Sequence, residues 1–232
     1  MSDPARHVRE NHSLLAQPEK LLLIWLARRM PGAINSDHLS ALGLTAMCVA
    51  GLSFAAFRLT PWAAAAVVLS LAANWLGDSL DGTLARVRDE QRPRYGYYVD
   101  HVIDLAGSTC LLGGLAASGL MSPLLAAVLL AAYLLVSAET YLATHARGVF
   151  RMSFLGVGPT ELRILIAAGA IRAAYDPWLL AGSFGPIALF DFGGAIASTA
   201  LAVVFVASAV RNTRFLYSAE RRPRRAGSCT AA

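Results

Sequence analysis

The chain has 232 residues, of which 56% are hydrophobic and only 15% are charged, and its mean hydropathy is +0.52. Because soluble domains carry about 25% charged residues, this composition argues against a soluble protein and indicates a polytopic membrane protein with one domain. The net charge of +5 could suggest nucleic-acid binding, but the distribution of the basic residues along the chain argues against it.

The three cysteines, Cys48, Cys110 and Cys229, are odd in number and widely spaced. Two of them lie in apolar runs, where cysteine behaves as a small hydrophobic residue. The sequence therefore predicts neither a disulfide framework nor a zinc site.

Residues 1–37 are expected to form a cytoplasmic segment that contains one short amphipathic helix. Residues 1–19 are polar and are expected to be loosely ordered, whereas residues 20–30 place apolar side chains such as Leu22 beside basic ones such as Arg28. This run is too short to cross a membrane and is flanked by charge. It therefore predicts a helix that lies in the membrane interface, although an amphipathic helix packed on the bundle would show the same pattern.

Residues 38–212 are predicted to be all-α, with six transmembrane helices. Crossing ~30 Å of hydrocarbon takes about 20 apolar residues, and Gly and Pro signals mark the turns between the charge-free runs. The expected helices cover about 39–57, 61–77 continuing into the acidic residues that follow, 95–119, 123–146, 159–181 and 187–210. Residues 213–232 are expected to form a basic cytoplasmic tail.

The basic residues predict the orientation of these helices. Six crossings place both termini on one side, and of the 20 basic residues only Arg58 and Arg172 fall on or near the other side. Because cytoplasmic loops are rich in Lys and Arg, both termini are expected to be cytoplasmic, in the inner (plasma) membrane of the cell. The positive charge thus belongs to membrane topology and anionic lipid rather than to nucleic acid.

Four aspartates lie where the second and third expected spans meet a short basic connection. Asp78 and Asp81 are three residues apart, and Asp100 and Asp104 are four apart, so each pair shares a helix face. A charge within a membrane helix costs on the order of 2.5–3.5 kcal/mol on insertion scales, so these acids need a partner that neutralises them. Divalent cations such as Mg²⁺ bind carboxylate oxygens and keep positions open for substrate phosphates. The alternative is a polar helix face or a pair of buried ion pairs, which the lack of a basic residue beside the acids in the apolar segments disfavours.

The same residues resemble the signature of the CDP-alcohol phosphotransferase (CDP-alcohol phosphatidyltransferase) family. The pattern is D-x-x-D-G-x-x-A-R, nine further residues, and then G-x-x-x-D-x-x-x-D. Its fixed positions are filled by Asp78, Asp81, Gly82, Ala85, Arg86, Gly96, Asp100 and Asp104. The resemblance implies transfer of a phosphatidyl or phosphoalcohol group from a CDP-linked donor to an alcohol, with release of CMP, in phospholipid biosynthesis. It also implies a six-helix membrane fold and a homodimer.

The resemblance further implies roles for the motif residues. Asp78, Asp81, Asp100 and Asp104 would bind Mg²⁺ or Mn²⁺, as two ions, and Asp104 would also be the general base. The nucleotide would lie against Asp78, Gly82, Ala85, Arg86 and Gly96. Small residues also serve close helix packing, and an arginine such as Arg86 can simply obey the positive-inside rule, so both alternatives remain open.

Further charged residues on the same side are candidates for binding the acceptor or a lipid head group. They are Glu139, Arg147, Arg151, Glu161 and Arg163. For the arginines, ordinary positive-inside charge is an equal alternative. His101 is expected to be a polar packing residue, and Asn74 to form a hydrogen bond between helices.

Two other classes of membrane protein also place acids in helices. Asp-rich membrane prenyltransferases hold a diphosphate through Mg²⁺, but they need a second Asp-rich motif, which nothing after Asp104 supplies. Ion-coupled transporters carry intramembrane acids, but here the acids lie near one face only. The motif is expected to bind the CDP group, which all donors of the family share. It therefore predicts neither the alcohol acceptor nor whether the donor is CDP-diacylglycerol or a CDP-alcohol.

Overall fold

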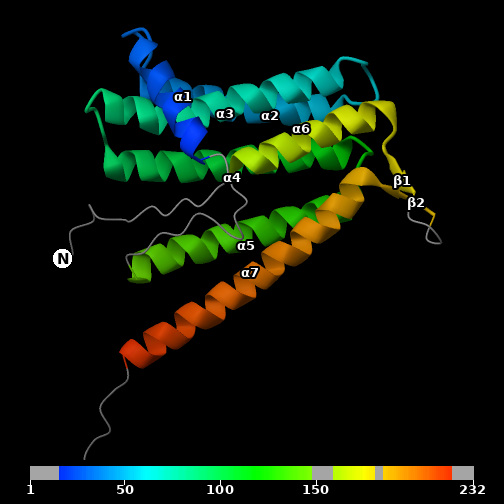
Figure 1. The fold of residues 1–232 in the computed structure, drawn as a ribbon. Coiled ribbons are helices and arrows are strands. Elements are labelled where there is room, and N and C mark those ends of the chain that lie inside the picture. The colour runs from blue at the N-terminus through cyan, green and yellow to red at the C-terminus, as the bar shows by residue number, and fades with distance from the viewer. Residues whose placement is uncertain (1–15, 148–158, 181–184, 221–232) are drawn as a thin grey trace, which may run out of the picture.

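The computed structural model describes residues 16–147, 159–180 and 185–220, and this part of the chain is almost entirely helical. A layer of three long helices forms its centre: α2 (Ser36–Ala55), α3 (Ala63–Val87) and α4 (Pro93–Ala117). Figure 1 shows α2 between the two others, and it packs along both, whereas α3 and α4 make little direct contact with each other. The two helices that carry the motif are therefore held in place by a third.

Glycines allow α2 to approach its neighbours closely. A Cβ atom added to Gly77 of α3 would lie 2.6 Å from the carbonyl oxygen of Leu39 in α2. A Cβ added to Gly114 of α4 would collide with the backbone of Gly51 in α2. Small residues at helix contacts are a common means of close packing in membranes, and here they fix the spacing of α3 and α4.

Three further helices complete the bundle: α5 (Pro123–Arg147), α6 (Pro159–Tyr175) and α7 (Leu189–Ala219). α5 packs on α4 and pairs with α7, while α6 packs on α3. A core of apolar side chains joins α2, α3 and α4 with parts of α5 and α6, around residues such as Phe54, Val67 and Leu111.

α1 (Ala16–Arg29) crosses the end of the bundle near the start of α2 (Figure 1). Its buried residues Leu23 and Ala27 join a second apolar cluster with Leu80 and Leu84 of α3. The helix begins before residue 20, so the expectation of loose order is wrong for residues 16–19. Large apolar side chains, among them Trp25 with 50% exposure, point away from the bundle.

α6 ends at Tyr175, so the expectation of a helix to residue 181 is wrong. Pro177 follows, and the residue before a proline is pushed out of the helical conformation. Asp176 then accepts hydrogen bonds from Arg172 and from the backbone N–H of Trp178. Beyond it, β1 (Trp178–Leu180) and β2 (Pro186–Ala188) form a short antiparallel hairpin that leads into α7.

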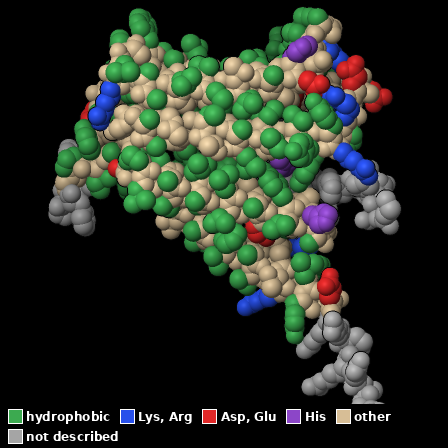
Figure 2. All heavy atoms as spheres, turned by 180° about the vertical axis from the view of Figure 1, so that it is seen from behind, with side chains coloured by type: hydrophobic (Ala, Val, Ile, Leu, Met, Phe, Trp, Pro, Cys, Tyr) green, Lys and Arg blue, Asp and Glu red, His purple; other side chains and the backbone are tan. Residues whose placement is uncertain are grey.

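Four of the described helices are long and apolar enough to cross a membrane: α2, α3, α5 and α7. α4 carries two of the motif acids and α6 has only 17 residues, so neither meets these criteria. In Figure 2 hydrophobic side chains cover the flanks of the molecule, and most of the visible charged side chains lie toward one end. The protein is therefore an all-α integral membrane protein.

Candidate functional site

The motif acids of α3 lie between the two apolar clusters. Val67 and Leu71 of α3 belong to the central core, and Leu80 and Leu84 belong to the cluster under α1. Between them, Asn74 contacts α2 and α6, Asp78 contacts α6, and Ser79 contacts α1. This stretch of α3 lies near the end of the bundle that α1 crosses (Figure 1).

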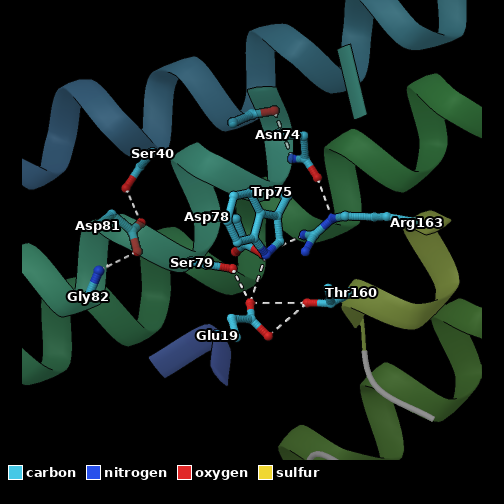
Figure 3. Close-up of polar contacts among 11 residues, drawn as sticks. Glu19, Ser40, Asn74, Trp75, Asp78, Ser79, Asp81, Gly82, Thr160 and Arg163 are labelled. Atoms are coloured by element: carbon cyan, nitrogen blue, oxygen red, sulfur yellow. Dashed lines mark hydrogen bonds and ion pairs between the residues drawn. The ribbon is translucent and has the colours of Figure 1, made fainter. Parts of the chain in front are cut away.

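Asp81 is held by two donors. The hydroxyl of Ser40 in α2 donates to its carboxylate at 2.6 Å, and the backbone N–H of Gly82 donates to the other oxygen. The carbonyl of Ser36 lies 3.1 Å from the same hydroxyl, whose single hydrogen is directed to the shorter contact with Asp81. The carboxylate of Asp81 is thereby directed toward α2 (Figure 3).

Asp78 has a basic partner that its sequence neighbours do not supply. The guanidinium of Arg163 in α6 forms an ion pair with Asp78 and also donates to the side-chain oxygen of Asn74 at 2.7 Å. Asn74 in turn donates to the carbonyl of Gly43 in α2 at 3.0 Å, which confirms its role between helices. The expectation that the acids lack a basic neighbour is therefore wrong for Asp78, because α6 brings Arg163 across from a distant part of the chain (Figure 3).

Asp100 and Asp104 lie on α4, one turn apart, and both are partly shielded from solvent. The charges of Asp78, Asp81 and Asp100 all act on Asp104, so the motif acids of α3 and α4 share one electrostatic environment. His101, which lies between the two acids of α4 in sequence, packs between Tyr97 and Tyr141, with ring centroids 4.1 and 4.7 Å away. Its expected role as a polar packing residue is confirmed.

The donor set suits a hard divalent cation, since carboxylate oxygens are the ligands that Mg²⁺ and Mn²⁺ take. Within the described residues, however, no three Asp, Glu, His or Cys side chains gather around one point. Asp78 points to Arg163, and Asp81 points to Ser40 and Gly82. The residues therefore fit a cation by their chemistry and by their placement on two helices that both pack on α2, provided that these carboxylates exchange their present partners.

Two of the motif glycines face open space. No described atom lies within 4 Å of a Cβ added to Gly96, and a Cβ added to Gly82 would meet only the flexible end of Arg86, at 3.4 Å. Close helix packing, which explains Gly77 and Gly114, therefore does not explain Gly82 and Gly96. Arg86 is exposed and donates to the hydroxyl of Thr83 at 3.0 Å, and Ala85 lies beside it on the same end of α3.

The candidate acceptor residues fall into two places. Arg163 lies at the motif, with Glu161 at the start of the same helix. Glu139 and Arg147 lie between α5 and α7, where Asn212 donates to Glu139 at 2.6 Å and accepts from Arg147. The Arg147 guanidinium also stacks on the Phe215 ring, 4.1 Å from its centroid.

Arg151 lies outside the described residues. Within the described residues of α5 and α7, the buried Nε of Arg147 has no hydrogen-bond partner.

Sequence reasoning missed a second acidic centre beside the motif. Glu19 of α1 accepts hydrogen bonds from the indole of Trp75 at 2.8 Å, from Ser79 at 3.1 Å and from Thr160 at 3.1 Å (Figure 3). The available signal was that Glu19 is the acidic residue of an otherwise basic and apolar helix.

Comparison with known proteins places this arrangement in a family. Residues 38–210 match the sequence profile described as CDP-alcohol phosphatidyltransferase. The structure is similar to the crystal structure of Mycobacterium tuberculosis phosphatidylinositol phosphate synthase (PgsA1) with CDP-DAG bound. That match has a TM-score of 0.49 and 18% identity, over 88% of this chain and 94% of that chain. None of the curated proteins is significantly similar to this sequence. Because the profile covers most of the chain, this protein belongs to the CDP-alcohol phosphatidyltransferase family of membrane transferases.

Proposed function

We propose that this protein transfers a phosphatidyl or phosphoalcohol group from a CDP-linked donor to an alcohol and releases CMP, in phospholipid biosynthesis. The observation that carries the proposal is the complete motif, with its acids on α3 and α4, which both pack on α2, inside the region that matches the family profile. In the reaction, an acceptor oxygen forms a bond to the donor phosphorus, the bond from phosphorus to the CMP oxygen breaks, and the acceptor proton passes to the enzyme.

Asp78, Asp81, Asp100 and Asp104 are the residues proposed to hold two Mg²⁺ or Mn²⁺ ions. Such ions would offset the negative charge that develops on the phosphoryl oxygens and on the departing CMP. Asp104 is proposed to take the acceptor proton. It lies about 6 Å further along α4 than Asp100, by the rise of the helix, and so lies deeper in the bundle, where a hydroxyl can arrive from the membrane side.

The nucleotide is proposed to lie against the end of α3 and the start of α4. The open space at Gly82 and Gly96 allows a pyrimidine and its ribose to approach the helix backbone. Ala85 adds no bulk there, and Arg86 can pair with a donor phosphate. These features support a CDP group that enters from the end of the bundle where charged side chains gather.

Arg163, Glu161, Glu139, Arg147 and Arg151 are proposed to serve the acceptor or a lipid head group. Arg163 supports this most directly, because it already pairs with an oxyanion, the carboxylate of Asp78. One guanidinium nitrogen of Arg163 contacts Asp78 and its Nε donates to Asn74, and an arginine freed from these partners can bind a phosphate through two parallel hydrogen bonds.

The proposed setting is the inner (plasma) membrane, with six crossings and with the motif and both termini on the cytoplasmic side. α1 is proposed to lie in the interface, because its exposed side chains Leu21, Leu22 and Trp25 are apolar. A homodimer is also proposed. A monomer found by mass measurement in nanodiscs would contradict it.

The deciding experiment incubates purified protein with Mg²⁺, with either CDP-diacylglycerol or a CDP-alcohol, and with a panel of alcohol acceptors. We expect CMP release with one donor class, and its loss when EDTA removes the metal. Full CMP release in excess EDTA would overturn the metal assignment. Turnover of a prenyl diphosphate without any reaction of a CDP donor would favour the prenyltransferase alternative.

A further inference from the structure

The N-terminal helix places a carboxylate against the helices of the site. Glu19 is partly buried, whereas its neighbours Gln17, Pro18 and Lys20 are exposed, so this side chain is the one that turns inward. Its oxygens accept from donors on two different helices, Trp75 and Ser79 of α3 and Thr160 of α6 (Figure 3). One side chain of α1 thus bridges α3 and α6.

The two ends of this bridge adjoin the ion pair at the motif. Ser79 directly follows Asp78, and Thr160 precedes Arg163 by three positions and so lies one turn away on the same face of α6. α3 and α6 are therefore joined twice in one region: directly, through Asp78 and Arg163, and indirectly, through Glu19.

The hydrogen bonds of Glu19 are suited to holding its carboxylate in one orientation between α3 and α6. An ionised carboxylate only accepts, and its partners here are an indole N–H and two hydroxyls, all of which can donate. Hydrogen bonds to a charged acceptor are roughly twice as strong as neutral ones. Thr160 reaches both carboxylate oxygens, at 3.1 and 3.2 Å, which orients the group as well as holding it.

We propose that Glu19 is a positioning residue through which α1 holds α6 at the separation from α3 that lets Arg163 reach Asp78. This inference rests on the proposed function, in which Asp78 takes a new partner. When Asp78 exchanges Arg163, the direct link between α3 and α6 weakens, and the Glu19 bridge keeps α6 in place. α1 is then part of the frame of the active site as well as a surface helix.

The first test measures geometry and needs no turnover. Spin labels at exposed Leu69 of α3 and Leu165 of α6 report the distance between these helices by pulsed electron paramagnetic resonance, in the full chain with its native cysteines replaced by alanine. We expect Glu19→Ala and Thr160→Val to broaden this distance distribution, and Glu19→Gln, which keeps one acceptor oxygen, to broaden it less. Thr109→Val is the matched control, because the Thr109 hydroxyl donates to the carbonyl of Leu105 in its own helix.

The second test measures donor KM and kcat for the same variants. We expect Glu19→Ala to raise donor KM roughly tenfold, the size expected for loss of a charged hydrogen-bond acceptor, with Glu19→Gln between it and the wild type. Glu220→Gln, an exposed change at the end of α7, should match the wild type. Distance distributions that stay unchanged in both Glu19→Ala and Thr160→Val would overturn the proposal. Absence of CMP release by the wild type would instead overturn the proposed function, and the distance measurement would still decide the role of Glu19.

Discussion

The carboxylate of Asp78 has two competing partners, Arg163 and the proposed cation. It is paired with Arg163 in the structure, and the motif marks it as a ligand of a cation. In the proposed site a metal ion would replace Arg163 as the partner of Asp78, whereas Asp104 is proposed to take the acceptor proton.

Substitution of these two acids should therefore have different effects. We expect Asp104→Asn to lower turnover by about 10²–10⁴-fold, the usual loss when a general base is removed, while donor binding weakens much less. Asp78→Asn should weaken both. An amide keeps the shape and one acceptor oxygen but cannot take a proton. Titration of the donor, alongside CMP release at saturating metal, measures the two effects separately.

The opposite pattern would contradict this division of roles. In that pattern, Asp104→Asn would lose donor binding as completely as Asp78→Asn does. Its turnover at saturating metal and donor would nevertheless stay near that of the wild type. Thr199→Val is a suitable control, since Thr199 is exposed and its hydroxyl donates to the carbonyl of Ala195 within the same helix.

The sequence predicted which residues form the motif but not how they are paired. The spacing of Asp78 and Asp81 on one helix face follows from helical periodicity alone. The contacts of Asp78 with Arg163, 85 positions away, and of Trp75 with Glu19, 56 positions away, follow from the packing of α6 and α1 on α3. Local patterns carry no signal for such partners.

At the scale of elements, the spacing of α3 and α4 depends on their contacts with α2. Gly113 and Gly114 are neighbours on α4 and test this directly. A Cβ on Gly114 would collide with the backbone of Gly51, whereas no described atom lies within 4 Å of a Cβ on Gly113. We expect Gly114→Ala to destabilise the protein by about 1–3 kcal/mol, as overpacking does.

Gly113→Ala is the matched control for this prediction. It should leave the unfolding temperature unchanged or raise it, because alanine favours the helix by up to about 1 kcal/mol over glycine. Thermal unfolding of both variants in one detergent measures the difference. Equal unfolding temperatures would show that α2 and α4 are not held by this close contact.

Charge-free runs located the starts of the helices to within a few residues, because the lipid-facing part of a helix is apolar. The end of the last helix was missed: α7 continues to Ala219, past the expected end at about 210 and into the expected tail, because its final turns carry Arg211 and Arg214 and so break the charge-free run. The starts of α5 and α6 fall on Pro123 and Pro159 as expected from their turn signals. The end of α6 was missed because the apolar residues after Pro177 continue the hydrophobic run while the backbone turns into a hairpin. Strands of three residues are too short to show a period that distinguishes them from helix.

At the scale of the whole molecule, the open question is how many helices cross the membrane. Figure 1 shows the turns from α2 to α3 and from α4 to α5, and the hairpin after α6, at one end of the bundle, opposite α1. α6 has 17 residues and so spans about 26 Å, slightly less than ~30 Å of hydrocarbon. The acids of α4 face the bundle, so they do not prevent this helix from crossing.

Labelling of single cysteines in intact cells tests the six crossings and their direction together. In a chain without native cysteines, we expect an impermeant maleimide to label Leu59→Cys, Leu124→Cys and Tyr175→Cys from outside, since all three are exposed at the end opposite α1. Glu90→Cys and Glu220→Cys should react only after the membrane is permeabilised, because the basic residues place their end in the cytoplasm. If Leu124→Cys reacted only after permeabilisation, α4 would not cross the membrane. If Tyr175→Cys reacted only after permeabilisation, α6 would not cross it. Reversal of all five patterns would place the motif outside, where the CDP-linked donors proposed here are not made.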